Sequence, residues 1–332
     1  MLGSSAQALC RVHDLAMLDL DGVVYVGGAA VPGAPGHLAK ARAAGMRLAF
    51  ITNNASRPPE QVAAHLRDLG VEAESDDVVT SSQAAARLLA DRFGRAARIV
   101  ALGAEGLREA LEAEGLVPVG ANDEAVAIAT GYSPDVRWAE IMRAAVRIRD
   151  GLPWVASNTD LTFPAEFGLA PGHGVLVDML RRFAGVQPDV AGKPARPLLD
   201  ETVRRVGGER PLMVGDRLDT DILGARNAGL ASLLVLTGVT GLPELVAAPP
   251  EQRPTYLAPD LGGLLVAHEA PVADGRAFAL GGWRASVDDG ALVVTGRGDP
   301  ADWWRAVAEA AWAHLDESGE PVHLSGVEAP AR

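Results

Sequence analysis

The chain has 332 residues with a formal net charge of −13, and 48% of its residues are hydrophobic. At about 150 residues per domain, this length predicts two or three domains, and the apolar content is too high for a disordered chain. The acidic balance argues against binding a nucleic-acid backbone, which needs a clustered basic face. A single cysteine, Cys10, excludes an intramolecular disulfide and any metal site built from several cysteines.

Two further patterns bear on membranes and secretion. The N-terminus has no basic segment followed by a long apolar stretch, so we expect no signal peptide. No run reaches the roughly 18 apolar residues that a membrane-spanning helix needs. We therefore expect a globular, cytoplasmic protein that does not bind membranes.

Short apolar segments alternate with helical segments over the first two thirds of the chain. Helices are predicted over segments such as 36–45 and 135–151, which both end at a glycine. The apolar segments lack polar alternation, which is typical of strands buried on both faces. They are 16–20, 47–52, 98–103, 125–130, 152–157, 211–216 and 232–237. This order predicts an α/β fold with a doubly wound, mainly parallel sheet.

The end of the chain changes character. Segment 241–264 is rich in proline and glycine, and predicted strands at 283–287 and 291–295 are joined by an Asp-Asp-Gly turn. A predicted helix over 300–316 carries three tryptophans at near-helical spacing, which indicates core packing. This small α+β extension is loosely similar to part of an acetyltransferase fold, but it lacks the R-x-x-G-x-G turn that binds a pyrophosphate. We expect it to pack on the rest of the chain or to mediate self-association.

Two carboxylates follow the first predicted strand. Asp19 lies at its carboxyl end and Asp21 opens the turn that comes next. In open α/β sheets this edge is where ligands bind. A hard cation such as Mg²⁺ would offset the cost of placing two carboxylates there, whereas a solvated turn is the simpler alternative. The spacing does not fit an EF-hand calcium loop.

Three more strand ends or loops carry polar groups. Thr52, Asn53 and Asn54 follow a second strand and could hold phosphoryl oxygens or cap the turn. Lys193, one of only two lysines, lies between a glycine and a proline and could meet an anion or simply be a surface residue. Asp216 ends a third strand, and Asp221 follows at a helix start, where it could also act as a cap.

Taken together, these four motifs resemble those of the haloacid dehalogenase superfamily. The matching segments are DLDGVVY from Asp19, ITNN ending at Asn54, GKP around Lys193 and GDRLDTD from Gly215. Within the insertion between the second and third motifs, segments 157–164 and 171–180 are similar to the α/β cap of the class IIA subgroup. That subgroup includes phosphoglycolate, pyridoxal-phosphate, 4-nitrophenyl and NagD-type phosphatases.

The resemblance implies a division of the chain. Residues 1–80 and 185–258 would form the catalytic core, 81–184 the cap and 260–332 the extension. The same layout, with a C-terminal extension, occurs in a member that acts on glycerol 3-phosphate. Glycerol 3-phosphate is therefore the first substrate candidate, with 2-phosphoglycolate and pyridoxal 5′-phosphate as alternatives.

The resemblance also implies a mechanism. Asp19 would attack phosphorus and form an aspartyl-phosphate, while Asp21 would act as general acid and base. Mg²⁺ would be bound by Asp19, the backbone carbonyl of Asp21 and Asp216, and Asp221 would hold metal-bound waters. Lys193, Thr52 and backbone amides near Asn53 and Asn54 would hold the phosphoryl oxygens.

The cap would select the leaving group through the loop 158–174. Its polar side chains are Asn158, Asp160 and His173, which could contact substrate or only stabilise the loop. His173 lies between two glycines, where a specificity side chain would be easy to present, so we include it among the substrate-binding candidates.

Other functions fit less well. A dehalogenase would need neither Asp21 nor Asp216. A phosphomutase usually carries its cap between the first and second motifs, where this chain is too short. A non-enzymatic binding or scaffold protein would be expected to have lost at least one of Asp19, Asp21, Lys193 and Asp216, which are all present. We therefore expect a Mg²⁺-dependent phosphatase that acts on a small phosphomonoester, with self-association left open.

Overall fold

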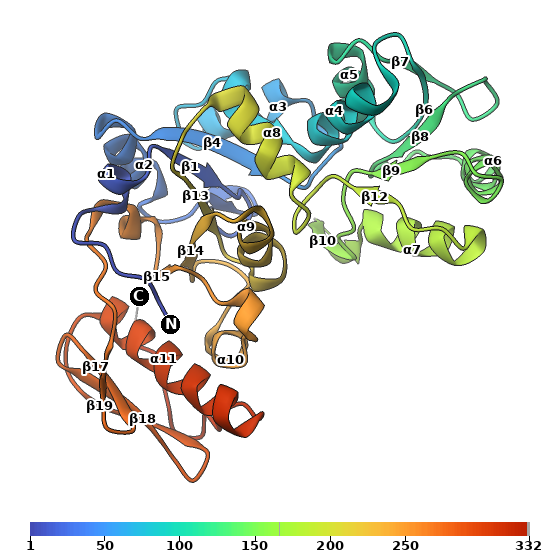
Figure 1. Cartoon of the computed structure of the whole chain (residues 1–332). Coiled ribbons are helices and arrows are strands. Elements are labelled where there is room, and N and C mark those ends of the chain that lie inside the picture. Colours follow the sequence, from blue (N-terminus) through green and yellow to red (C-terminus); the bar gives the residue numbers. More distant parts are fainter. Residues whose placement is uncertain (166, 331–332) are drawn as a thin grey trace. The chain divides into compact units, whose positions relative to one another are not determined.

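The computed structural model describes residues 1–165 and 167–330, which divide into two units (Figure 1). The first unit contains residues 1–48, 69–71 and 208–332, and the second contains residues 49–68 and 72–207. The boundary between them passes through β4 (Arg47–Thr52).

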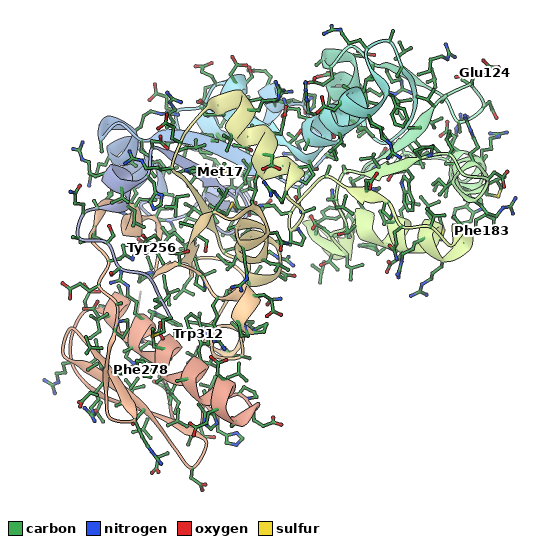
Figure 2. The ribbon with its side chains drawn as sticks, in the orientation of Figure 1. Met17, Glu124, Phe183, Tyr256, Phe278 and Trp312 are labelled. Atoms are coloured by element: carbon green, nitrogen blue, oxygen red, sulfur yellow. The ribbon has the colours of Figure 1, made fainter. Side chains whose placement is uncertain are left out.

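The first unit is built on parallel strands in the order β15-β14-β13-β1, next to which β4 begins. The predicted strands are confirmed here, with small shifts of their ends. Met17, labelled in Figure 2, lies in β1 and is fully buried. The strands are β1 (Leu15–Leu18), β13 (Pro211–Gly215), β14 (Ala231–Val235) and β15 (Tyr256–Ala258), with a small hairpin of β2 (Tyr25–Val26) and β3 (Ala29–Ala30). The helices are α1 (Leu9–Val12), α2 (Ala34–Ala43), α9 (Leu223–Ala228) and α10 (Leu242–Val246).

The C-terminal part of this unit is an antiparallel sheet covered by one long helix. The strands are β16 (Val272–Asp274), β17 (Ala277–Leu280), β18 (Trp283–Asp288) and β19 (Ala291–Gly296), and the helix is α11 (Pro300–Ser318). Figure 1 shows α11 along one face of β17–β19. The predicted strand–turn–strand–helix order is therefore confirmed, but β16 and β17 were not predicted.

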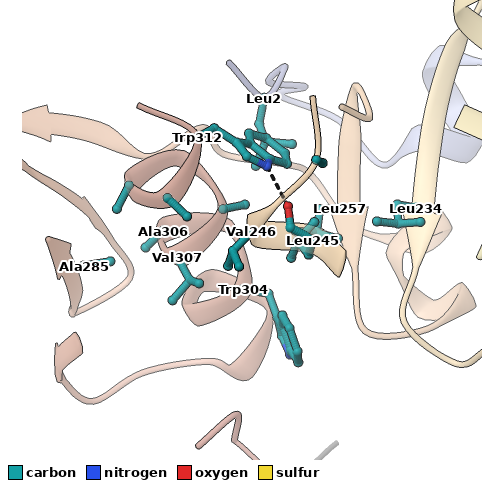
Figure 3. Close-up of a cluster of buried hydrophobic side chains, with 14 of the residues drawn as sticks. Leu2, Leu234, Leu245, Val246, Leu257, Ala285, Trp304, Ala306, Val307 and Trp312 are labelled. Atoms are coloured by element: carbon teal, nitrogen blue, oxygen red, sulfur yellow. Dashed lines mark hydrogen bonds between the residues drawn. The ribbon is translucent and has the colours of Figure 1, made fainter. Parts of the chain in front are cut away.

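The three tryptophans of α11 are buried, as the sequence predicts. They belong to one hydrophobic cluster that also contains Leu234 of β14 and Leu257 of β15 (Figure 3). The C-terminal part therefore shares its core with the parallel sheet of the first unit, because the same buried side chains serve both.

The second unit contains a five-stranded parallel sheet in the order β12-β9-β8-β6-β7, together with the rest of β4 paired to β5 (Val78–Thr80). Its strands are β6 (Arg98–Leu102), β7 (Val117–Val119), β8 (Ala127–Thr130), β9 (Trp154–Ala156) and β12 (Asp189–Val190). A separate antiparallel hairpin consists of β10 (Thr162–Ala165) and β11 (Gly168–Pro171). The predicted strands at 98–103, 125–130 and 152–157 are confirmed, whereas β7 and the hairpin were not predicted.

Amphipathic helices of the second unit cover both sides of this sheet. In Figure 1, α4 and α5 lie on one side and α6 and α7 on the other. The helices are α3 (Pro59–Asp68), α4 (Ser81–Phe93), α5 (Glu105–Ala113), α6 (Trp138–Arg149), α7 (His173–Ala184) and α8 (Pro197–Val206). Ala144, Ile148, Val177 and Leu180 bring the apolar faces of α6 and α7 onto the sheet core.

The predicted division into core, cap and extension has other residue limits than the two units. That three-part division therefore stays a prediction. Among the helices of residues 1–165 and 167–330, none is long and apolar enough to cross a membrane.

Candidate functional site

Asp19 and Asp21 occupy the end of β1 in the first unit. The Asp19 amide donates to the carbonyl of Val214 (2.9 Å), which extends the pairing of β1 with β13 by one residue. Asp19 is half-buried, whereas Asp21 is exposed in a turn that the Gly22 amide closes on the Tyr25 carbonyl (2.8 Å). The strand thus fixes the backbone of Asp19, and the turn directs the chain back immediately after it.

Asp216 follows β13 and is completely buried. Its Oδ2 accepts a hydrogen bond from the Val239 amide (2.6 Å), and its carbonyl oxygen accepts one from the Thr240 amide (3.2 Å). Gly22 adopts a φ of +84° beside it, and a Cβ there would collide with the Asp216 carboxylate. The pocket around this carboxylate therefore requires a glycine in the turn after Asp21.

Asp221 lies in a π-helical turn, Leu218–Ile222, and is 1% exposed. Its Oδ2 accepts a hydrogen bond from the Arg217 amide (3.1 Å). The neighbouring Asp219 is exposed and instead pairs with the Arg217 guanidinium (2.8 Å). The local fold therefore separates the two aspartates: Asp219 lies at the surface, and Asp221 turns inward and caps the turn.

Asp19, Asp216 and Asp221 come together. One carboxylate oxygen from each lies within 4.8 Å of the other two, and two of the three residues are buried. Three carboxylates so close, with little water around them, repel one another unless a cation lies between them. Oxygen-only ligands of this charge fit a hard divalent cation such as Mg²⁺ or Ca²⁺. Asp21 is not in this cluster of the described residues, and the resemblance implies that its backbone carbonyl would hold such an ion.

In the second unit, Thr52 ends β4 and begins a tight turn. Its Oγ1 accepts a hydrogen bond from the Asn54 amide (3.0 Å), and Asn54 Oδ1 accepts one from the Ser56 amide (2.9 Å). Thr52 is buried and Asn54 is exposed. Both side chains therefore act as turn caps in this structure, and the expected contacts with phosphoryl oxygens stay a prediction.

Two serines that were not among the predicted site residues hold the same turn. Ser81 Oγ donates to the carbonyl of Asn53 (2.7 Å), and Ser82 Oγ donates to that of Ala55 (2.9 Å). Both serines are fully buried in the first turn of α4, which Thr80 caps with Gln83. The Thr-Ser-Ser-Gln capping box could have predicted the start of α4. It does not predict that the two serines bond to the turn at Asn53 and Ala55.

Lys193 is 2% exposed, and the Lys193–Pro194 peptide bond is cis. The main chain of Lys193 is bonded to the side chain of Asn53, through the Lys193 amide (2.9 Å) and the Lys193 carbonyl (3.0 Å). The alternative that Lys193 is a surface residue is wrong, because the residue is buried.

His173 is buried as well. It begins α7, and its Nε2 lies 3.2 Å from Thr130 Oγ1, which also accepts a hydrogen bond from Trp154 Nε1 (3.0 Å). Burial lowers the pKa of the His173 imidazole to about 4, against a weaker opposite effect of the hydrogen bond at Thr130. The ring is therefore neutral at pH 7 and favours a structural role; a substrate contact of His173 stays a prediction.

Asn158 and Asp160 stabilise their loop. Asn158 Nδ2 donates to the Asn53 carbonyl (2.7 Å), and Asn158 Oδ1 accepts from the Asp160 amide (3.1 Å). Asp160 Oδ1 accepts from Asn53 Nδ2 (3.1 Å). Of the two roles left open for these residues, loop stabilisation is the one that these bonds support.

Two family models match the chain between residues 16 and 264. The model described as haloacid dehalogenase-like hydrolase matches residues 16–117, and a second, HAD-hydrolase-like model matches residues 190–264. A third model, a GCN5-related N-acetyltransferase-like domain, matches residues 280–332. The loose similarity of the extension to an acetyltransferase fold is therefore confirmed.

Two curated relatives are similar to most of this chain. The D-glycerol 3-phosphate phosphatase of Mycobacterium tuberculosis is 43% identical over 92% of this chain and 88% of its own length. A 5′-nucleotidase of Bacillus subtilis is 35% identical over 68% of this chain and 87% of its own.

Among solved structures, the M. tuberculosis glycerol phosphate phosphatase in complex with magnesium matches with a TM-score of 0.85 at 42% identity, over 95% of this chain and 94% of that one. The 4-nitrophenylphosphatase of Thermotoga maritima matches with a TM-score of 0.72 at 31% identity, over 77% and 98%.

Proposed function

Because the chain belongs to the haloacid dehalogenase-like hydrolases, we propose that it is a Mg²⁺-dependent phosphatase that hydrolyses glycerol 3-phosphate to glycerol and phosphate. The cluster of Asp19, Asp216 and Asp221 is the observation that carries this proposal, because it presents a nucleophile candidate within a cation site. The M. tuberculosis relative supports the substrate, since it is similar over nearly the whole chain, including the extension.

In this proposal, Asp19, Asp216 and the carbonyl of Asp21 would hold Mg²⁺, and Asp221 would hold its waters. When bound, the ion would supply positive charge that offsets the repulsion between an anionic nucleophile and an anionic phosphate. The Asp19 carboxylate attacks phosphorus in line, and the bond from phosphorus to the leaving alcohol breaks. Asp21 gives its proton to the departing alkoxide and later takes a proton from the water that hydrolyses the aspartyl-phosphate.

Lys193 and Thr52 hold the phosphoryl oxygens together with backbone amides near Asn53 and Asn54. These roles are assigned from the family motifs.

The proposed substrate class is a small-molecule phosphomonoester. The proposal includes neither nucleic acid nor a membrane as a partner. A cytoplasmic location and self-association stay predictions.

A substrate panel tests the proposal. The values of kcat/KM with Mg²⁺ are measured for glycerol 3-phosphate, 2-phosphoglycolate, pyridoxal 5′-phosphate and a nucleoside 5′-monophosphate. A value for glycerol 3-phosphate at least tenfold above the others supports the assignment. Similar values for all four would instead indicate a phosphatase of broad specificity, and no turnover of any of them would refute the phosphatase.

A further inference from the structure

The side chain of Asn53 pairs with the main chain of Lys193 at two points. Asn53 Oδ1 accepts the hydrogen bond of the Lys193 amide (2.9 Å), and Asn53 Nδ2 donates to the Lys193 carbonyl (3.0 Å). The two peptide groups that flank the lysine Cα are therefore fixed by one carboxamide. Asn53 is 9% and Lys193 is 2% exposed, so water does not compete effectively for these bonds.

The second N–H of the same carboxamide is also used. Asn53 Nδ2 donates to Asp160 Oδ1 (3.1 Å), and a carboxamide nitrogen has only two hydrogens to donate. Both donors are thus bonded within the protein, and none is left for a phosphoryl oxygen. The Asp160 carboxylate also sets which way the carboxamide faces, because it accepts from the nitrogen and repels the oxygen.

The segments around these three residues are packed against one another. A Cβ on Gly192 would lie 2.6 Å from Asn53 Oδ1 and 2.7 Å from the carbonyl oxygen of Ser157. Asn158 Nδ2 donates to the Asn53 carbonyl (2.7 Å), so the loop that carries Asp160 is bonded to the turn that carries Asn53. The position of the Lys193 main chain therefore depends on side chains from two other segments.

We propose that Asn53 and Asp160 are positioning residues that set the place of Lys193 and thereby the affinity of the protein for the phosphoryl group. The inference rests on the proposed function, in which the Lys193 ammonium holds a phosphoryl oxygen. Asn53 is therefore assigned through its side chain to Lys193 and not to the substrate. Asp160 links the inserted segment to phosphate binding, because it orients the carboxamide that holds the lysine.

The test exchanges the two side chains. Asn53→Asp keeps an acceptor for the Lys193 amide, but it loses both donors and places a second carboxylate against Asp160. We expect the inhibition constant of inorganic phosphate to rise at least tenfold, and the KM values of two phosphomonoesters with different alcohols to rise by the same factor. In Asn53→Asp combined with Asp160→Asn, a donor again lies between the two positions, so at least a threefold recovery is expected.

Control variants separate positioning from general damage. Thr202 is buried in α8, and its hydroxyl donates to the Leu198 carbonyl (2.7 Å). Thr202→Val loses a buried hydrogen bond in the same unit, and it should leave the phosphate inhibition constant within twofold of wild type. If Asn53→Asp does not fold, Asp160→Ala removes the acceptor of the Asn53 carboxamide and should raise the phosphate inhibition constant at least threefold.

Three outcomes decide the matter. A double variant no better than Asn53→Asp, or a phosphate inhibition constant unchanged in Asn53→Asp or Asp160→Ala, overturns the positioning role. A wild-type protein that hydrolyses no phosphomonoester refutes the proposed function instead. A phosphate inhibition constant that shifts in Asn53→Asp, recovers in the double variant and stays unchanged in Thr202→Val supports the inference.

Discussion

Replacement of Trp312 by alanine tests whether the C-terminal part is an integral piece of the first unit. Trp312 is 2% exposed, and its indole nitrogen donates to the carbonyl of Leu245 (2.7 Å), as Figure 3 shows. The Arg253 guanidinium lies 5.4 Å from the ring centroid and also pairs with Asp316 at 2.7 Å. The tryptophan thus joins α11 to α10 and to the segment before β15.

The expected cost follows from these contacts. Truncation of a buried tryptophan to alanine costs about 3–5 kcal/mol through lost burial and the cavity left behind. The Leu245 carbonyl loses its donor, and the stacked guanidinium loses its ring, which places the estimate at the upper end of that range. Trp312→Phe keeps most of the ring and loses the hydrogen bond, so about 1–2 kcal/mol is expected.

The assay is urea unfolding, followed both by circular dichroism and by residual phosphatase activity. Because α11 shares one core with β14 and β15, both probes should report the same destabilisation. Val293 in β19 is 40% exposed and provides a control, since Val293→Ala should cost less than about 0.5 kcal/mol. A loss below about 1 kcal/mol for Trp312→Ala, or activity that survives after the circular dichroism signal of the C-terminal part is lost, would refute the reasoning.

The remaining predictions concern the metal and pH. A saturating concentration of Mg²⁺, about 100 times its dissociation constant, should stabilise the wild type by about 2.7 kcal/mol. Asp216→Asn should lose most of this gain in a thermal-unfolding assay, and an equal gain in both proteins would argue against the carboxylate site. Burial lowers the pKa of the His173 imidazole from 6.5 to about 4, so the unfolded chain binds more protons than the folded one between these values. The free energy of unfolding should therefore rise with pH in that window, and His173→Gln should reduce the rise between pH 5 and pH 7 by about 2 kcal/mol; an unchanged pH dependence of urea unfolding would contradict it.

The sequence predicted those features that depend on local pattern. Buried parallel strands have flat apolar runs, so the strands that carry Asp19 and Asp216 could be identified and their carboxyl ends expected at one edge. The short edge strands, such as β7 with its Pro118, carry too little pattern to be recognised.

Contacts between distant segments could not be predicted in this way. The glycines beside His173 suggested a side chain presented to the substrate, but the amides of Gly172 and Gly174 donate to the carbonyls of Leu161 and Asp160 (both 2.8 Å). Glycines are needed there because a Cβ would collide with the 159–161 backbone, and this close approach buries the imidazole. The pairing of Asn53 with Lys193 depends likewise on tertiary packing, since the two residues lie 140 positions apart.

The net charge of the chain is unevenly distributed. From Asp260 onward the chain has 12 acidic and 5 basic residues, so it carries −7 of the net charge of −13. The acidic excess is therefore concentrated away from the carboxylate cluster, and the net charge alone gives no information about the site. The scarcity of lysine is more informative, because one of only two lysines is the buried Lys193.

The most direct test of the central claim is the turnover of glycerol 3-phosphate by Asp19→Asn in saturating Mg²⁺, measured beside the wild type and with the fold checked by circular dichroism. An amide cannot attack phosphorus, so a folded Asp19→Asn protein should retain less than about a hundredth of the wild-type kcat. A folded Asp19→Asn protein that retains more than this would contradict the assignment of Asp19 as the nucleophile.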